Sequence, residues 1–175
     1  KEVLHITDEV STRFEIPHLV KNLGEDGPVL VFDKVEDYDE KVVANVCGTR
    51  KRICAGLDVS QDELYARLIE AWRLPKKPKT VRTALVREKM VDLSRIPILT
   101  HFEKDAGPYV TSGVVHARSV DGTVENVSFH RFQVLDKRHF AIRLVPRHLF
   151  KLWKMAKAAG KDLDVAISIG VHPAV

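Results

Sequence analysis

A short segment rich in proline and lysine, residues 75–79, limits the possible folds of this chain more than any other part of it. Proline has no amide hydrogen and a fixed φ, so two prolines within four residues interrupt regular structure. Helix and strand patterns alternate before the segment, whereas strand patterns dominate after it. The sequence therefore predicts a mixed α+β fold, with a small N-terminal α/β domain at 1–79 and a second, strand-rich domain at 80–175.

The first domain shows both helical and strand periodicity. Apolar spacing predicts a short helix over 16–23 that ends at Gly24, and β-branched runs predict strands at 29–35 and 41–46. Ser60 and Glu63 form a capping box, in which each side chain can bond the other residue's amide at a helix start. The helix that follows should carry an apolar stripe at Leu64, Leu68 and Trp72 and end near residue 74.

The second domain reads mainly as strands. Weak alternation favours a strand at 80–86, and composition favours strands at 109–117, 124–134, 140–145 and 163–170. The dipeptide Asp121-Gly122 is typical of a hairpin turn between the second and third of these five strands. Pro146 suits the first turn of a helix that ends at Gly160, with a stripe at Leu149, Leu152, Trp153 and Ala156.

Composition excludes several classes of protein. The net charge of +4 is spread over 175 residues without a clustered basic face, so nucleic-acid binding is not expected. No apolar run approaches the roughly 20 residues that a membrane-spanning helix needs, and the first residues do not resemble a secretory signal. Cys47 and Cys54 match neither a zinc spacing nor a disulfide framework. We therefore expect a cytoplasmic protein without a membrane span.

Polar residues in the region 124–149 suggest a binding site. On a regular strand Asn126, Ser128 and His130 share one face, and Phe129 and Arg131 share the other. A helix start exposes amides and the positive end of a dipole, so Arg147 and His148 there could bind a phosphate. The Asn126 oxygen and a His148 nitrogen could instead be two ligands of a cation such as manganese. From these residues alone, a solvent-facing or capping His148 and a surface ion pair of Arg131 stay open as alternatives.

Five separate runs carry a resemblance to a known family: LSRIPILTHFE (93–103), DAGPYVTSGVV (105–115), NVSFHR (126–131), IRLVPRH (142–148) and IGVHP (169–173). Their order and spacing closely resemble the UbiD family of decarboxylases throughout, and five runs are far more specific than any single motif. The N-terminal residues 2–5 and 48–50 also look like that family, so the resemblance covers the whole chain.

The resemblance implies a reversible, non-oxidative decarboxylase of aromatic or α,β-unsaturated acids. Its cofactor would be prenylated FMN, made by a separate flavin prenyltransferase and held through manganese, with potassium nearby, in a domain that resembles a split β-barrel flavin reductase. By the same resemblance Asn126 and His148 match metal ligands and Arg131 matches the catalytic arginine. Further cofactor contacts fall at Thr111, Ser128, Phe129, His130, Arg143, Leu144, Val145 and Arg147.

Two features depart from the family pattern: carboxylates expected later in the family are missing here, and the family domain continues past residues 170–175. The family's third metal ligand, a glutamate, and its acid-base carboxylates come from beyond the equivalent of Val175, so we expect either a truncated chain or one subunit of a split enzyme. The expected partners are a carboxylic acid substrate and the remaining portion or a complementary subunit, in a homo- or hetero-oligomer. A non-catalytic assembly subunit and a flavin-binding protein without decarboxylase activity are the alternatives.

The two central residues also raise a geometric problem. Asn126 and Arg131 are an odd number of residues apart, so a regular strand would point them to opposite faces. A bulge or a strand end between them, or a long ligand that each contacts at a different end, would reconcile both roles with one cofactor.

Overall fold

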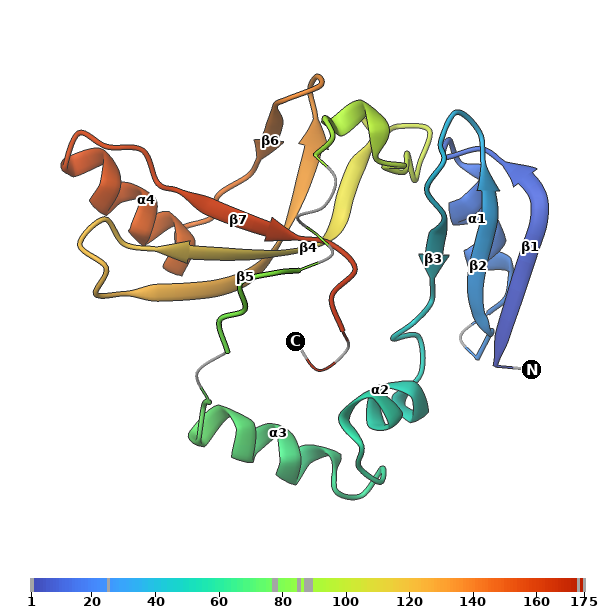
Figure 1. The fold of residues 1–175 in the computed structure, drawn as a ribbon, viewed down its shortest axis with the longest axis horizontal. Helices are drawn as coiled ribbons and strands as arrows, with labels where there is room; N and C mark the ends of the chain where they lie inside the picture. The colour runs from blue at the N-terminus through green and yellow to red at the C-terminus, as the bar shows by residue number, and fades with distance from the viewer. Residues whose placement is uncertain are drawn as a thin grey trace. The chain divides into compact units, whose positions relative to one another are not determined.

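The computed structural model of the protein describes residues 2–24, 26–76, 79–84, 86, 90–172 and 174. The chain forms two compact units: Lys1–Pro97 together with His172–Val175, and Ile98–Val171. The first combines helices with a small sheet, and the second is built on a four-stranded sheet (Figure 1). The mixed α+β class predicted from the sequence is therefore confirmed.

The first unit is built around a three-stranded sheet in the order β1-β2-β3. β1 (Val3–Val10) and β2 (Val29–Val35) are parallel, and β3 (Val42–Ala44) runs antiparallel to β2. Parallel neighbours need a crossover, which α1 (Glu15–Asn22) supplies. Ile16 of α1 and Leu30 and Phe32 of β2 are fully buried and form the centre of this small core.

In the first unit, the predicted helices and strands agree with the structure where buried and exposed residues follow a regular pattern. β2 has the predicted bounds, α1 begins one residue earlier than predicted, and Gly24 after it has the positive φ that a glycine helix end requires. β3 is shorter than the predicted 41–46. β1 was not predicted, because seven of its eight residues are at least partly exposed and lack apolar alternation.

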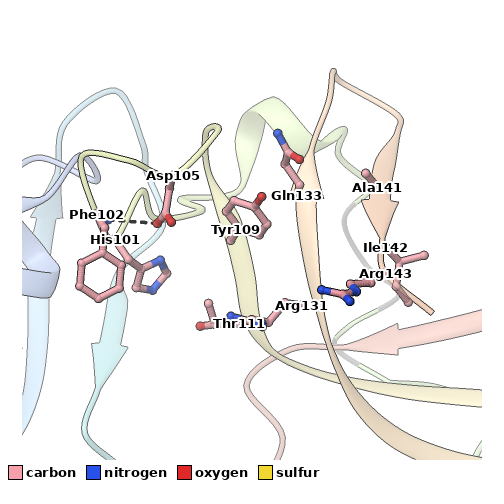
Figure 2. A pocket seen from close by; sticks show the side chains of 10 residues that line it. All are labelled: His101, Phe102, Asp105, Tyr109, Thr111, Arg131, Gln133, Ala141, Ile142 and Arg143. Carbon is pink, nitrogen blue, oxygen red and sulfur yellow. Dashed lines mark hydrogen bonds between the residues drawn. The ribbon is translucent and has the colours of Figure 1, made fainter. Parts of the chain in front are cut away.

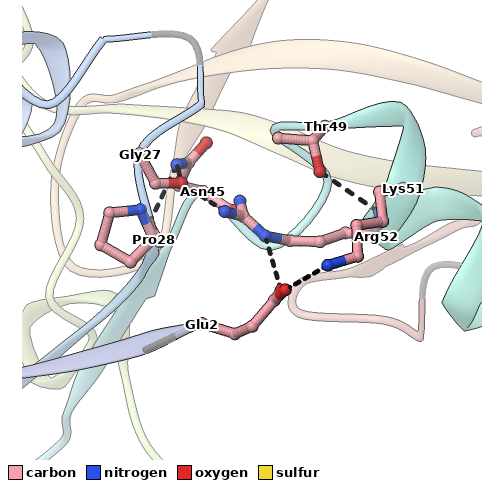
Figure 3. A network of polar contacts seen from close by, with 7 residues as sticks. All are labelled: Glu2, Gly27, Pro28, Asn45, Thr49, Lys51 and Arg52. Atoms are coloured by element: carbon pink, nitrogen blue, oxygen red, sulfur yellow. Dashed lines mark hydrogen bonds and ion pairs between the residues drawn. The ribbon is translucent and has the colours of Figure 1, made fainter.

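A polar network joins β3 to α2 (Arg50–Leu57), a helix that the sequence analysis missed (Figure 3). The Asn45 side chain donates to the carbonyl oxygens of Gly27 (2.9 Å) and Pro28 (3.0 Å). Arg52 donates to the carbonyl oxygens of Asn45 and Gly27. The Thr49 hydroxyl caps α2 by accepting from the Arg52 amide. Side chains rather than apolar periodicity therefore hold this connection in place.

The reciprocal bonds of the predicted capping box form in the turn before α3 (Leu64–Arg73), whose own N-cap is Glu63 and has no side-chain capping bond. The Ser60 amide donates to the Glu63 carboxylate (3.0 Å), and the Glu63 amide donates to the Ser60 hydroxyl (3.3 Å). The predicted apolar stripe is only partly buried, since Leu64 is buried whereas Trp72 is 83% exposed. The strand predicted at 80–86 is wrong for residues 80–84, which form no strand, and Leu85 lies outside the described residues. A single 3-10 turn, η2 (Leu93–Arg95), follows.

The second unit is an antiparallel sheet in the order β6-β5-β4-β7, with one helix against it. β4 (Tyr109–Arg118) pairs with both β5 (Glu125–Val134) and β7 (Val165–Ser168), and β6 (Phe140–Ile142) adds to the outer edge of β5. α4 (His148–Ala158) contacts β4 and β5. The core holds Val114 and Val115 of β4, Phe132 of β5, and Leu149, Leu152 and Ala156 of α4.

The hairpin between β4 and β5 is confirmed, with Gly122 in the left-handed region at φ 74°. β6 and β7 are shorter than predicted, because pairing ends at Ile142 and covers only four residues of β7. The predicted helix start is corrected: Arg147 is the N-cap of α4 and His148 its first residue, so Pro146 precedes the helix. Among the described residues, no helix combines the length and apolar character that crossing a bilayer requires.

Candidate functional site

A pocket of about 510 Å³ lies on one face of the β4-β5-β6 sheet, within the second unit (Figure 2). The pairing of Tyr109 with Gln133, and of Gln133 with Ala141, places these three residues in one row across the strands. Because side chains alternate between faces along a strand, residues two positions away share the same face. The second row is formed by Thr111, Arg131 and Arg143, which also line the pocket.

A bulge in β4 shapes this face. Val110 pairs with Phe132 and Gly113 pairs with His130, so β4 advances three residues while β5 advances two. The extra residue falls at 111–112, opposite Arg131. Bulges bend a strand and redirect a side chain, and they are frequent beside binding sites. β5 therefore has neither a bulge nor a strand end between Asn126 and Arg131, so those two predicted explanations are wrong, and a long ligand contacted at different ends is the one that remains.

The loop before β4 forms the opposite wall of the pocket, with His101, Phe102 and Asp105 (Figure 2). The Asp105 carboxylate accepts from the Phe102 amide (3.0 Å), and the Asp105 amide donates to the Phe102 carbonyl (3.0 Å). The Gln133 side chain on β5 donates to the Ala106 carbonyl (3.2 Å). Local turns and a side chain of the sheet therefore hold this wall in place.

The pocket is rich in positive charge and in hydrogen-bond donors. Arg131 and Arg143 form no ion pair with any described residue. Asp105 Oδ2 already accepts a hydrogen bond from the Phe102 amide. Tyr109, Thr111 and Gln133 add neutral polar groups. A guanidinium matches a carboxylate or a phosphate with two parallel hydrogen bonds. The arrangement therefore suits an anionic ligand.

Asn126, Ser128 and His130 lie on the other face of β5 and do not line this pocket. The Asn126 amide nitrogen donates to the Ser128 hydroxyl (3.0 Å), and the His130 Nε2 lies 3.1 Å from the same oxygen. All three side chains are half-buried, whereas Val127, Phe129 and Arg131 between them are exposed. The alternation predicted from the sequence holds, so β5 presents Asn126 and Arg131 to opposite sides.

The remaining predicted site residues surround the start of α4. Val145, Arg147 and His148 are exposed, and Leu144 is half-buried. The Arg147 amide donates to the Val145 carbonyl (2.6 Å), which tightens the turn into the helix. Of the predicted set, the pocket thus brings together Thr111, Arg131 and Arg143, and it leaves the others outside its lining.

The donor chemistry of Asn126 and His148 fits part of a metal site. Because the Asn126 nitrogen is the donor to Ser128, its oxygen has the chemistry of a metal ligand, and an imidazole nitrogen is a common second ligand. No group of three or more His, Cys, Asp or Glu side chains among the described residues could hold a metal ion. Asn126 and His148 therefore have donor atoms suited to a metal, and their role as ligands stays a prediction.

Sequence reasoning missed most of the pocket wall, including His101, Phe102 and Asp105. Gln133 and Tyr109 could have been found, because once Arg131 is chosen, alternation on β5 and pairing across the hairpin lead to both. The loop residues carry no such periodic signal.

Two family models match the chain from end to end. The 3-octaprenyl-4-hydroxybenzoate carboxy-lyase N-terminal domain matches residues 1–72, and the Rift-related domain of the same carboxy-lyase matches residues 73–175. The chain belongs to the UbiD family. The division between the two family models at 72/73 lies close to the proline- and lysine-rich segment, whereas the compact units of the structure divide at 97/98.

Relatives of this UbiD chain include decarboxylases of different acids. It is 37% identical to the anhydromevalonate phosphate decarboxylase of Methanothermobacter thermautotrophicus, over 99% of the chain and 41% of that protein. It is 27% identical to the gallate decarboxylase of Lactiplantibacillus plantarum, over 98% of the chain and 40% of that enzyme. The chain therefore spans about 40% of the length of these relatives.

Solved UbiD structures share the fold. The UbiD-class enzyme HmfF from Pelotomaculum thermopropionicum, in complex with FMN, is 34% identical with a TM-score of 0.93, over 99% of this chain and 40% of that one. The vanillic acid decarboxylase of Sedimentibacter hydroxybenzoicus is 25% identical with a TM-score of 0.87, over 98% and 40%. An evolved dimeric form of HmfF contains prenylated FMN.

Proposed function

We propose that this chain is part of a reversible, non-oxidative decarboxylase of an aromatic or α,β-unsaturated acid. The observation that carries the proposal is the pair of guanidinium groups, Arg131 and Arg143, that line one pocket without an ion-pair partner among the described residues. Both side chains are exposed at the pocket, and the Arg131 guanidinium can bind a carboxylate there with two parallel hydrogen bonds. Membership of a carboxy-lyase family supports this role.

The pocket residues divide the work between binding and orientation. Arg131 holds the carboxylate that leaves as carbon dioxide, and Tyr109 and Thr111 on the adjacent strand orient the rest of the acid. Decarboxylation leaves a carbanion, which side chains stabilise poorly. Prenylated FMN, when bound, supplies the electron sink for that carbanion. Asn126 and His148 would hold its phosphate through a divalent metal such as manganese, because a phosphate dianion is costly to bury without a cation.

Further contacts to the flavin are assigned to Ser128, Phe129, His130, Leu144, Val145 and Arg147. The third metal ligand and the acid-base carboxylates would come from the part of the relatives' length that this chain does not span, either in a longer chain or in a complementary subunit. A metal site assembled from both parts agrees with the finding that the described residues contain no group of three or more His, Cys, Asp or Glu side chains that could hold a metal ion.

Anhydromevalonate phosphate is the first substrate to assay. Relatives that decarboxylate it are 31–38% identical to this chain, above the 27% of the gallate enzyme. An acid that carries a phosphate also suits a pocket with two arginines, since one guanidinium can bind the carboxylate and the other is left for the phosphate.

The proposal is tested with Arg131→Ala in the chain combined with its remaining portion, prenylated FMN and manganese. We expect carbon dioxide release to fall by at least about 100-fold, as for loss of one group that stabilises charge in a transition state. Arg138→Ala is the matched control, because Arg138 is exposed in the β5-β6 turn and outside the pocket. Unchanged turnover in Arg131→Ala would contradict the assigned role.

The same mixtures separate the alternatives. A non-catalytic assembly subunit predicts no decarboxylation with the unsubstituted chain, even when every component is present. A flavin-binding protein without this chemistry predicts that Arg131→Ala binds the flavin and behaves like the unsubstituted chain in every assay.

A further inference from the structure

His101 lines the same pocket as the two arginines, and the proposed function gives it no role. It lies in the loop before β4, on the wall opposite the sheet (Figure 2). Its Nδ1 is buried and has no hydrogen-bond partner among the described residues. Buried polar atoms are nearly always paired, so an orphaned ring nitrogen next to a cavity needs an explanation.

The orphaned nitrogen determines which tautomer His101 adopts when its ring is neutral. A neutral imidazole has one N–H donor and one acceptor nitrogen. Orphaned buried N–H groups are rarer than under-satisfied buried acceptors, because the donor loses its only bond. This argument favours the tautomer with the lone pair on Nδ1 and the hydrogen on Nε2.

The second nitrogen is the accessible one. Nε2 of His101 is not among the buried unpartnered atoms, and His101 makes no hydrogen bond in the described part of the chain. Since His101 lines the cavity, its exposed N–H is available to a ligand there. The pocket therefore combines two guanidinium groups with an N–H donor from the facing wall.

We propose that His101 is a substrate-positioning residue, whose Nε2–H donates to an oxygen of the carboxylate that Arg131 binds. This inference rests on the proposed function, because it assigns the pocket to the reacting acid. A carboxylate has about four lone-pair sites, and a two-bond arginine contact leaves others for a third donor. A donor from the opposite wall limits rotation of the carboxylate about the arginine, which fixes the bond that breaks.

The tautomer and the ligand are tested by nuclear magnetic resonance on the ¹⁵N-labelled chain, titrated with sodium benzoate and, separately, with inorganic phosphate. We expect the neutral His101 ring to show the Nε2–H tautomer and its Nε2 resonance to shift with benzoate. A larger response to phosphate would overturn the carboxylate assignment in favour of a phosphoryl group, and an Nδ1–H tautomer would overturn the proposal itself.

Two substitutions separate positioning from packing. The amide nitrogen of Gln can take the place of Nε2, whereas the shorter Asn side chain reaches only the place of Nδ1. His101→Gln should bind benzoate within about 3-fold of the unsubstituted chain, and His101→Asn should bind at least about 10-fold more weakly, the loss expected for a bond to a charged group. With the remaining portion present, the loss in His101→Asn should appear mainly in KM. Equal effects of the two variants would overturn the positioning role.

Failure of this inference is distinct from failure of the proposed function. If benzoate binding depends on Arg131 but neither His101 variant changes it, His101 has no positioning role and the decarboxylase proposal stands. If Arg131→Ala leaves benzoate binding and turnover unchanged, the pocket is not the carboxylate site and both proposals fall. Urea unfolding midpoints of all variants show whether a loss of binding reflects a loss of folding.

Discussion

At the scale of single residues, close packing makes a glycine necessary in the turn before α2. A Cβ on Gly48 would lie 1.7 Å from the Asn45 side-chain oxygen, far inside contact distance. That same amide group bonds the carbonyl oxygens of Gly27 and Pro28, so it cannot move away without losing both bonds (Figure 3). The residue type at position 48 is therefore set by a side chain three positions earlier.

We predict that Gly48→Ala lowers the free energy of unfolding by roughly 1–3 kcal/mol, the cost of leaving such carbonyl groups without their partner. The Asn45→Ala variant removes the clashing atoms, so adding Gly48→Ala to it should cost less than about 0.5 kcal/mol more. Urea unfolding followed by circular dichroism measures all four members of this cycle. Additive losses would show that the clash with Asn45 is not the cause.

At the scale of elements, the β4-β5 hairpin is held by one carboxylate. Asp121 Oδ1 accepts from the hydroxyl groups of Ser119 (2.5 Å) and Thr123 (2.9 Å) and from the Thr123 amide (3.1 Å). These bonds lower the pKa of Asp121 below its usual value, with the Ser119 hydroxyl as the largest cause. The turn positions both long strands of the sheet, so it contributes to the register at the pocket.

The lowered pKa predicts a pH-dependent contribution of the hairpin to stability. A carboxyl group with a lower pKa in the folded state stabilises the fold above its unfolded pKa, and this stability is lost as the pH falls through the folded pKa. Asp121→Asn should therefore be less stable than the unsubstituted chain at pH 7, and the difference should begin to shrink near pH 4, about the usual pKa of an aspartate, and be lost as the pH falls through the lower pKa of the folded state. Urea unfolding at a series of pH values measures it, and a constant difference would contradict the mechanism.

The β4 bulge shows what local pattern could and could not predict at this scale. Alternation along β5 was predicted, and it places Asn126 with Ser128 and Arg131 with Gln133. The bulge at 111–112 was not predicted in β4, because no residue there departs from ordinary strand composition. Pairing between two strands decides where an extra residue is accommodated, and one strand's sequence does not contain that information.

At the scale of the whole molecule, the proposed metal site needs more than the described residues supply. We propose Asn126 and His148 as two ligands, and no group of three or more His, Cys, Asp or Glu side chains in the described part of the chain could hold a metal ion. Manganese prefers several oxygen and nitrogen ligands, so two should bind it weakly. Assembly with the remaining portion of the protein should therefore increase the affinity for manganese.

We predict that adding this portion strengthens manganese binding at least 10-fold. Asn126→Ala or His148→Ala should remove the gain, because loss of a ligand should weaken binding by at least the roughly 10-fold seen when a residue that only supports a ligand is replaced. Electron paramagnetic resonance of free Mn²⁺ measures the affinity. His116→Ala, an exposed histidine of β4, is the matched control. Full affinity in the chain alone would show that a complete site already exists within it.

The sequence by itself determined the elements whose residues alternate or repeat, because burial on one face imposes a period that can be read directly. β2, the β4-β5 hairpin, the Ser60 to Glu63 capping box and the buried stripe of α4 are examples. It also contained the runs that identify the UbiD family. Only the tertiary structure decided that Arg131 and Arg143 share a pocket with His101, because cross-strand pairing and a loop without periodicity bring these residues together.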